Sequence, residues 1–155
     1  MERESVWNYP RPPRLEPTTR QIRVLFNGAV IAETQRAYRV LETSHPPVYY
    51  IPREDVDPAK IELGEGSSFC EWKGSAIYFD VISGSLRARA AAWSYPDPVA
   101  AFLPIRDALA FYAGLMDECT VDGERVVPQP GGFYGGWITS ELDGPFKGAP
   151  GTAGW

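Results

Sequence analysis

Few residues in this sequence can hold a metal ion or form a disulfide. The chain of 155 residues has one histidine, His45, and two cysteines, Cys70 and Cys119. A structural zinc site takes four Cys or His ligands, and these residues are too few and too widely spaced to supply them. Two cysteines also argue against a disulfide scaffold in a chain of this length. The sequence therefore predicts no zinc knuckle, no other metal site and no cofactor.

Long apolar runs and an excess of positive charge are missing as well. No stretch of about 18 apolar residues occurs, so no membrane contact is predicted. The start, MERESVWNYPRPP, is charged and rich in proline, unlike a signal peptide, and a cytoplasmic location is expected by default. The net charge of −5 argues against binding to nucleic acid, which needs clustered positive charge.

Aromatic residues and short β patterns are plentiful. Apolar residues alternate from 22 to 26, and a second apolar run follows at 30–32. Between them stands Asn27-Gly28, the preferred two-residue turn, so a hairpin is predicted. Further strands are expected at 38–42, 48–51, 67–72, 76–82 and 86–93, the last three as an antiparallel meander.

The middle strand of the meander has two different faces. Ile77, Phe79 and Val81 point to one side and form a core face, because side chains alternate along a strand. The opposite face carries Ala76, Tyr78, Asp80 and Ile82. This mixture of aromatic and polar groups would suit the wall of a pocket.

One long helix is predicted between Val99 and Asp117. Asp97 can cap its start, and Pro98 suits the first turn. Apolar residues then recur at helical spacing at 105, 108, 109, 112, 115 and 116. The expected fold class is therefore mainly β with a single long helix.

Proline and glycine divide the chain into three regions. Residues 1–20 form a proline-rich arm, expected to be extended and to lie over the body. Residues 21–127 form a single globular β-rich domain. Residues 128–155, here called the tail, are rich in glycine and proline but also hold five large rings. A flexible linker has no use for such rings, so the tail is expected to pack on the body.

Several motifs of the body resemble a known family. They are RVLFNG (23–28), HPPVYYIPRED (45–55), FCEWKG (69–74), AIY (76–78) and AAWSYPDP (91–98). Together they are similar to the domain-of-unknown-function 427 family over about residues 21–127, and the tail resembles an extension of some members. The resemblance implies a β-tent-like fold of two antiparallel sheets with one helix. A β-tent relative, the thalidomide-binding domain of cereblon, holds its ligand in a cage of tryptophans, which makes an aromatic pocket plausible by analogy.

Two groups of residues are candidates for binding a small molecule. Trp72, Lys73 and Tyr78, with Trp93 and Tyr95, lie on neighbouring strands and could form a stacking wall with one cationic group. A second patch is formed by Tyr49, Tyr50, Arg53 and Glu54, in which the guanidinium of Arg53 suits a carboxylate or phosphate. The alternatives are that the rings only fill core, that Lys73 is a solvated turn residue, and that Arg53 makes a surface ion pair.

An enzymatic role would rest on Cys70, Lys73 or His45. A nucleophilic cysteine needs a neighbouring His or Lys to lower its pKa. Lys73 is expected on the opposite face from Cys70, however, and a lone strand cysteine is usually a small buried apolar group. The family has been labelled nucleotidyltransferase-like, but Gly84-Ser85 is followed by no Asp-x-Asp pair to hold Mg²⁺, which disfavours that activity.

Three functions are compatible with these patterns. The leading hypothesis is a small-molecule binding domain, with His45 and Arg53 as further polar contacts. The alternatives are an enzyme using Cys70 or Lys73, and a protein-interaction module built from the arm and tail. The sequence leaves open the ligand, the reaction, the choice between monomer and homodimer, and whether the tail covers the pocket.

Overall fold

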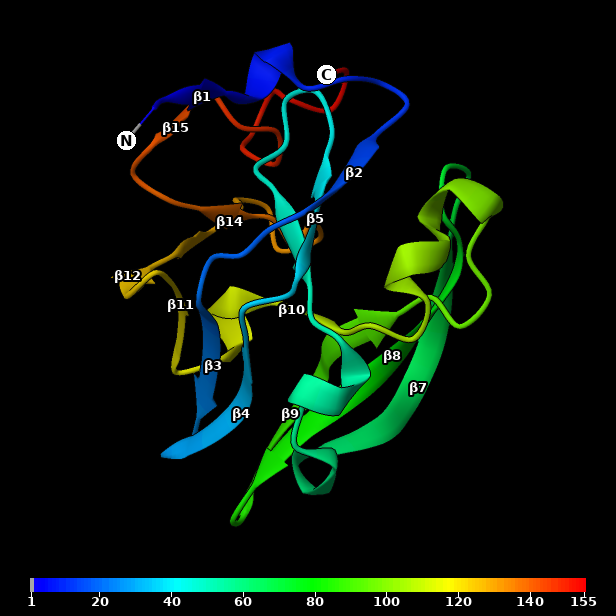
Figure 1. Ribbon diagram of the computed structural model, residues 1–155, viewed down its shortest axis with the longest axis vertical. Helices are drawn as coiled ribbons and strands as arrows, with labels where there is room; N and C mark the ends of the chain where they lie inside the picture. Colours follow the sequence, from blue (N-terminus) through cyan, green and yellow to red (C-terminus); the bar gives the residue numbers. More distant parts are fainter. Residues whose placement is uncertain (1) are drawn as a thin grey trace.

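Strands are the main regular secondary structure of the computed structural model, which describes residues 2–155, and most of them pair antiparallel (Figure 1). One four-stranded sheet has the order β10 (Ala110–Phe111), β9 (Leu86–Ser94), β8 (Gly74–Ser83), β7 (Ile61–Cys70). A second has the order β12 (Glu124–Arg125), β11 (Glu118–Val121), β3 (Ile22–Phe26), β4 (Ala29–Thr34). A third sheet joins β2 (Arg14–Pro17), β5 (Tyr38–Leu41) and β6 (Val48–Tyr50). The structure thus has three sheets of three or four strands, whereas the resemblance implies two sheets.

Short elements complete the chain. β1 (Glu4–Ser5) runs parallel to β15 (Leu142–Asp143), and β13 (Val127–Pro128) pairs with β14 (Trp137–Ile138). The helical segments are the 3₁₀ turns η1 (Val6–Asn8), η2 (Arg53–Asp55), η3 (Pro58–Lys60), η4 (Ala100–Ile105) and η5 (Ala113–Leu115). Over the described part of the chain, none is long and apolar enough to cross a membrane.

The predicted hairpin and meander are confirmed. In the hairpin of β3 and β4, Phe26 pairs with Ala29, and Asn27 and Gly28 have φ angles of 46° and 76°. A two-residue type I′ turn needs positive φ at both positions, which Asn-Gly tolerates best. The meander is β7, β8 and β9, with each strand antiparallel to the next.

The predicted long helix between Val99 and Asp117 is wrong. Within residues 2–155 the longest helical segment is η4, which has six residues. It contains Pro104, which lacks a backbone N–H and disfavours continued helix at the residue before it. Asp107 then takes a φ of 62°, in the left-handed region, which turns the chain out of η4.

Strand pairing accounts for the apolar residues that suggested the helix. Ala110 and Phe111 pair with Trp93 and Ala92, which makes β10 an edge strand of the meander sheet. Leu109 and Phe111 point into the largest cluster of buried side chains, whereas Ala108 and Ala110 point into a second one. The segment therefore serves two apolar clusters with the alternation of a strand.

The two clusters lie on opposite faces of the meander sheet. The main core fills the space between the two four-stranded sheets and includes Phe79 and Val81 of β8 (Figure 1). The second cluster includes Ala76 and Trp93, with Tyr78 packed against it, and is partly covered by η4 through Phe102. The two-faced character predicted for the middle strand is thus confirmed.

The arm and the tail are both bonded into the body. β2 of the arm pairs with β5, and β1 pairs with β15 of the tail. The tail also inserts Trp137 into the main core, where its side chain is 1% exposed and its Nε1–H donates to the carbonyl oxygen of Phe111 at 3.0 Å. Both termini lie at the same end of the molecule (Figure 1).

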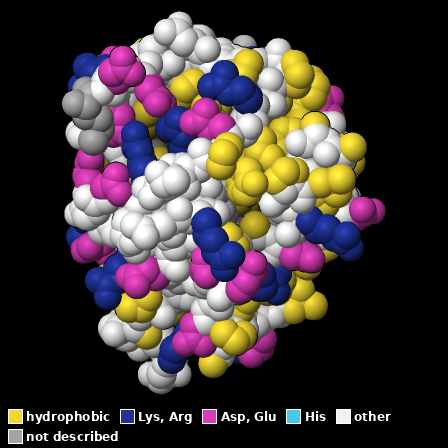
Figure 2. All heavy atoms as spheres, in the orientation of Figure 1, with side chains coloured by type: hydrophobic (Ala, Val, Ile, Leu, Met, Phe, Trp, Pro, Cys, Tyr) yellow, Lys and Arg dark blue, Asp and Glu magenta, His cyan; other side chains and the backbone are white. Residues whose placement is uncertain are grey.

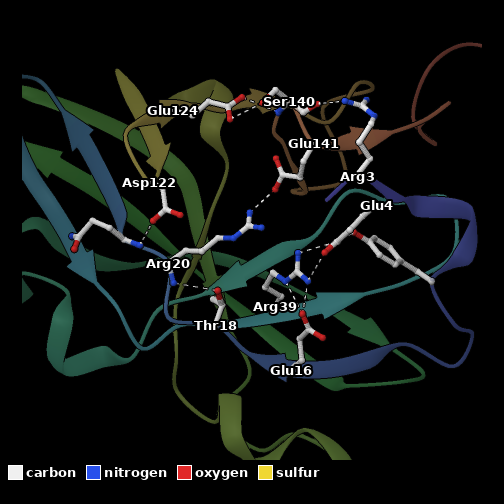
Figure 3. A network of polar contacts seen from close by, with 12 residues as sticks. Arg3, Glu4, Glu16, Thr18, Arg20, Arg39, Asp122, Glu124, Ser140 and Glu141 are labelled. Carbon is white, nitrogen blue, oxygen red and sulfur yellow. Dashed lines mark hydrogen bonds and ion pairs between the residues drawn. The ribbon is translucent and has the colours of Figure 1, made fainter. Parts of the chain in front are cut away.

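A buried polar network holds the arm, β5 and the tail together (Figure 3). Arg39 of β5 donates to Glu4 of β1 and Glu16 of β2, and its side chain is 7% exposed. Arg20 donates to Glu141 of the tail, whose side chain is 2% exposed. Segments that are distant in sequence are therefore joined by charged hydrogen bonds as well as by strand pairing.

Candidate ligand pocket

A cavity of about 320 Å³ lies beside the second cluster, where the β7–β8 turn, β9 and the tail meet. The structure brings most of the predicted site residues to it. They are Trp72, Lys73, Tyr78, Trp93 and Tyr95, together with His45 and Cys70. Residues from separate sequence motifs thus share one lining.

Two predicted ligand residues lie elsewhere. Tyr49 is 1% exposed in the main core, because alternation along β6 turns Tyr50 and not Tyr49 towards the second cluster. Arg53 lines a different hollow and donates from Nε to the carbonyl oxygen of Asp107 at 3.1 Å. Its guanidinium lies 4.9 Å from the centroid of the Phe79 ring.

A tight turn positions Cys70 and Lys73. Cys70 pairs with Gly74, so β7 ends at the cysteine and the three residues between them reverse the chain. Gly74 has a φ of 113°, and a Cβ there would lie 3.3 Å from the carbonyl oxygen of Asp97. The carbonyl oxygen of Lys73 accepts a hydrogen bond from the N–H of Val99 at 3.0 Å. The prediction that Cys70 and Lys73 face opposite ways is wrong, because the strand ends before Lys73 and both residues line the cavity.

The aromatic wall is fixed by contacts among its own rings. Trp93 packs on Tyr112 with ring centroids 4.6 Å apart and donates from Nε1 to the hydroxyl of Tyr50 at 3.3 Å. Tyr78 pairs with Trp93 across β8 and β9 and donates to Ser68 at 2.9 Å. Burial raises the pKa of Tyr112 to about 12, so its phenol keeps its proton near neutral pH. The wall therefore presents fixed ring faces and neutral hydroxyl groups.

The tail supplies a wall that the sequence reasoning did not assign to the site. Gly135 stands against Trp93 so closely that a Cβ there would lie 2.1 Å from the ring atom Cη2. A Cβ on Gly136 would lie 2.5 Å from the carbonyl oxygen of Pro46. The tail residues in the lining are Gln129, Phe133, Tyr134, Gly135 and Lys147. The sequence feature that could have indicated this wall is the glycine pair among large rings of the tail, since such glycines permit a close approach of the backbone.

Hydrogen bonding in the tail fixes the proton of His45. Gly136 donates its N–H to Oε1 of Gln129 at 3.0 Å, so Nε2 of this amide is the donor group. Nε2 donates to the carbonyl oxygen of Lys147 at 2.9 Å and lies 3.1 Å from Nδ1 of His45. Nδ1 must therefore accept, and the neutral imidazole carries its proton on Nε2, which lies 3.7 Å from Oε2 of Glu42.

The surroundings of His45 favour this neutral form. Burial lowers its pKa, and the positive charges of Lys147, Arg11 and Lys73 lower it further, against the opposing effect of Glu42. We expect an NMR titration of the imidazole carbons to give a midpoint below the ordinary value of about 6.5. The signal needs no assignment, since the chain has one histidine. The same signal in urea-unfolded protein serves as control, and a folded midpoint at or above the unfolded one would contradict the expectation.

The lowered pKa of His45 also makes the stability of the fold depend on pH. The folded state binds the His45 proton less readily than the unfolded chain does, so the contribution is fully present above about pH 6.5. It is lost as the pH falls from there through the lower folded value. Protonation also places an N–H on Nδ1 opposite the N–H of Gln129, which weakens the attachment of the tail.

Lys73 is the buried cation of the cavity. The residue is 9% exposed. Its Nζ lies 6.0 Å from the centroid of the Tyr95 ring and 5.9 Å from that of Phe102. Among residues 2–155 no group of three or more His, Cys, Asp or Glu side chains is placed to hold a metal ion. What the arrangement offers chemically is a set of ring faces, one buried ammonium group, an imidazole and a thiol.

Comparison with protein families identifies the body of the chain. The model of a domain of unknown function, DUF427, matches residues 14–122. The chain belongs to the DUF427 family. A comparison with curated proteins finds no match for it.

The DUF427 match divides the cavity lining into two parts. The matched region supplies the β7–β8 turn and the rings of Tyr78, Trp93, Tyr95 and Tyr112. The tail lies beyond residue 122, yet it supplies the wall that runs from Gln129 to Lys147. In this DUF427 protein the cavity is therefore built jointly by the family domain and by the segment that follows it.

Proposed function

We propose that this DUF427 protein is a small-molecule binding domain whose ligand occupies the cavity beside Trp93. The observation that carries the proposal is the composition of the lining, which combines ring faces with a few polar groups in one concave site. Ligand sites in proteins have this composition, and volumes of roughly 300–1,000 Å³ are usual for them. The cavity of about 320 Å³ stands at the small end of that range.

Fixed side chains support binding rather than simple core filling. Trp93 is held by Tyr112 on its face and by Tyr50 at its Nε1–H. The amide of Gln129 has a partner for its oxygen and for both of its N–H groups. A site whose groups are already held loses little conformational entropy when a ligand enters, which favours affinity.

Native mass spectrometry tests the proposal most directly. Protein purified gently from its source is compared in the native and the denatured state. We expect a non-covalent adduct that disappears on denaturation and is reduced in a Trp93→Ala variant. Absence of any adduct, together with no change of the Trp93 indole signal on screening a library of small aromatic compounds, would overturn the proposal.

An enzyme is the second candidate, because Cys70 and Lys73 line the same cavity. Cys119 provides an internal control for thiol reactivity: it is 2% exposed, and burial raises its pKa to about 12. In native protein we expect iodoacetamide to add once, at Cys70, as read from intact mass. A rate at pH 7 well above that of a free thiol would favour the enzyme, whereas a rate at or below it favours the binding domain.

A further inference from the structure

We propose that the ligand of this cavity is a small aromatic anion, with its ring against Trp93 and its acidic group beside Lys73. This inference rests on the proposed binding function and specifies its ligand class. It is carried by a buried cation that has no counter-ion among the described residues, and by the shape and charge of the surrounding walls.

The first step is the isolation of the Lys73 ammonium group. Within residues 2–155 no carboxylate oxygen comes within 4.0 Å of Nζ, and no hydrogen bond from Nζ is formed. The centroids of the Tyr95 and Phe102 rings lie 6.0 and 5.9 Å from Nζ. Buried charges in proteins are normally paired, because an unpaired one loses its hydration without compensation. A ligand anion would complete this site.

The second step is the sign of the charge around the cavity. The surface in Figure 2 has Lys and Arg side chains interspersed with Asp and Glu, so this face shows no large field of one sign. Inside the cavity, Lys73 and Lys147 both act on His45 as positive charges. Glu42 opposes them, but Arg11 already lies 3.5 Å from its Oε2. Glu71 also lines the cavity, so the lining holds two carboxylates and two ammonium groups, but Glu71 is an exposed residue. Within residues 2–155 no carboxylate oxygen comes within 4.0 Å of Nζ of Lys73, so an anion is favoured next to this atom.

The third step limits the number of negative charges. Nζ of Lys147 already donates to the backbone oxygen of Trp155 at 3.3 Å and lies 5.5 Å from the centroid of the Tyr134 ring. Among the lysines and arginines that line the cavity within residues 2–155, Lys73 is therefore the cation that a ligand can pair with. One carboxylate or a similar single anion fits this site, whereas a polyphosphate would bring charges that no lining group is free to meet.

The fourth step concerns the rest of the ligand. The ring of Trp93 and the ring of Tyr112 are inclined at 45° to each other and border the cavity with Tyr78. Flat aromatic compounds gain from offset or edge contacts with such rings in addition to the area they bury. The volume of about 320 Å³ suits one or two fused rings.

Three probes with the same ring system but different charges test the inference. Isothermal titration calorimetry would compare 2-naphthoate with the neutral 2-naphthamide and the cationic 2-naphthylmethylammonium, and the Trp93 indole N–H signal would locate binding. We expect 2-naphthoate to bind roughly 10–100-fold more tightly than the amide. In Lys73→Met this advantage is lost, whereas Lys60→Met, which removes a lysine outside the cavity lining, keeps it.

The outcomes separate the inference from the function it rests on. Equal binding of all three probes, or tightest binding of the cation, would overturn the anionic ligand class while leaving a binding pocket in place. Binding of none of them at millimolar concentration overturns the aromatic class and the proposed function together. If Lys73→Met does not fold, the comparison of the three probes on unmodified protein still decides the question.

Discussion

A single methyl group added at Gly135 is expected to force the tail away from the aromatic wall. The Cβ of Gly135→Ala would lie 2.1 Å from Cη2 and 2.9 Å from Cζ3 of Trp93. An ordinary contact is more than 1 Å longer, so either the ring or the tail backbone must move. The ring cannot move easily, because it packs on Tyr112 and donates to Tyr50. We therefore expect the backbone around 133–136 to shift.

The size of the effect follows from overpacking. Inserting a methyl group into a filled site typically costs about 1–3 kcal/mol of unfolding free energy, and we expect a value in this range from urea titrations. Binding of the cavity ligand should weaken in parallel, because Gly135 is part of the lining. Gly154→Ala is the matched control in the same tail, since nothing lies within 4 Å of a Cβ there.

A double-mutant cycle identifies the cause. Replacing Trp93 with Phe removes the ring atoms that the new methyl group meets. The cost of Gly135→Ala should then fall by more than half in the Trp93→Phe background, which is a coupling between contacting residues. Equal costs in both backgrounds would show that the glycine is needed for some other reason.

The sequence predicted the parts of the fold that depend on local patterns. Asn27-Gly28 specifies its turn through positive φ, and the strands of the meander follow from alternation and the turns between them. The pocket-facing residues of β8 and β9 were also predictable, because adjacent strands place Tyr78 opposite Trp93. These features require only a few neighbouring residues.

The missed features depend on contacts between distant residues. The apolar residues from 105 to 116 are compatible with a helix until Leu109 and Phe111 are seen to face the main core and Ala108 and Ala110 the second cluster. The tail wall depends on Gly135 meeting Trp93, 42 positions earlier in the chain. Tyr49 and Tyr50 differ by one position, so their roles depend on which face of β6 meets the cavity.

The attachment of the arm is expected to depend chiefly on Arg39. Its Nε donates to Oε1 of Glu16 at 3.0 Å, and its two terminal nitrogens lie 3.2 and 3.3 Å from the carboxylate oxygens of Glu4 (Figure 3). Burial acts to lower the pKa of Arg39, yet the bonds to Glu16 and Glu4 raise it overall. The guanidinium therefore stays charged and holds two arm carboxylates beside β5.

Removing the Arg39 guanidinium should lower the free energy of unfolding substantially. In Arg39→Met the carboxylate of Glu4 would lose its ion pair, and that of Glu16 would keep only Arg14, an exposed side chain at 3.5 Å. Breaking a fully buried ion pair costs roughly 3–5 kcal/mol. Since both carboxylates are about a third exposed, we expect a value near the lower limit, about 3 kcal/mol, in urea unfolding. Arg23→Met, which removes one partner of an exposed pair with Glu33, is the control and should cost less than about 1 kcal/mol.

The dependence on pH separates lost charge pairing from lost packing. Burial alone would raise the pKa of Glu4, but the bonds from Tyr9 and Arg39 lower it below its ordinary value of 4.5. Glu4 thus contributes stability that is present above pH 4.5 and is lost as the pH falls through its lower folded pKa. In Arg39→Met this loss should be smaller, so that the stabilities of variant and parent converge as the pH falls below 4.5 and through the lowered pKa of Glu4. Parallel curves would show that the guanidinium acts by packing, whereas convergence assigns its effect to the arm carboxylates.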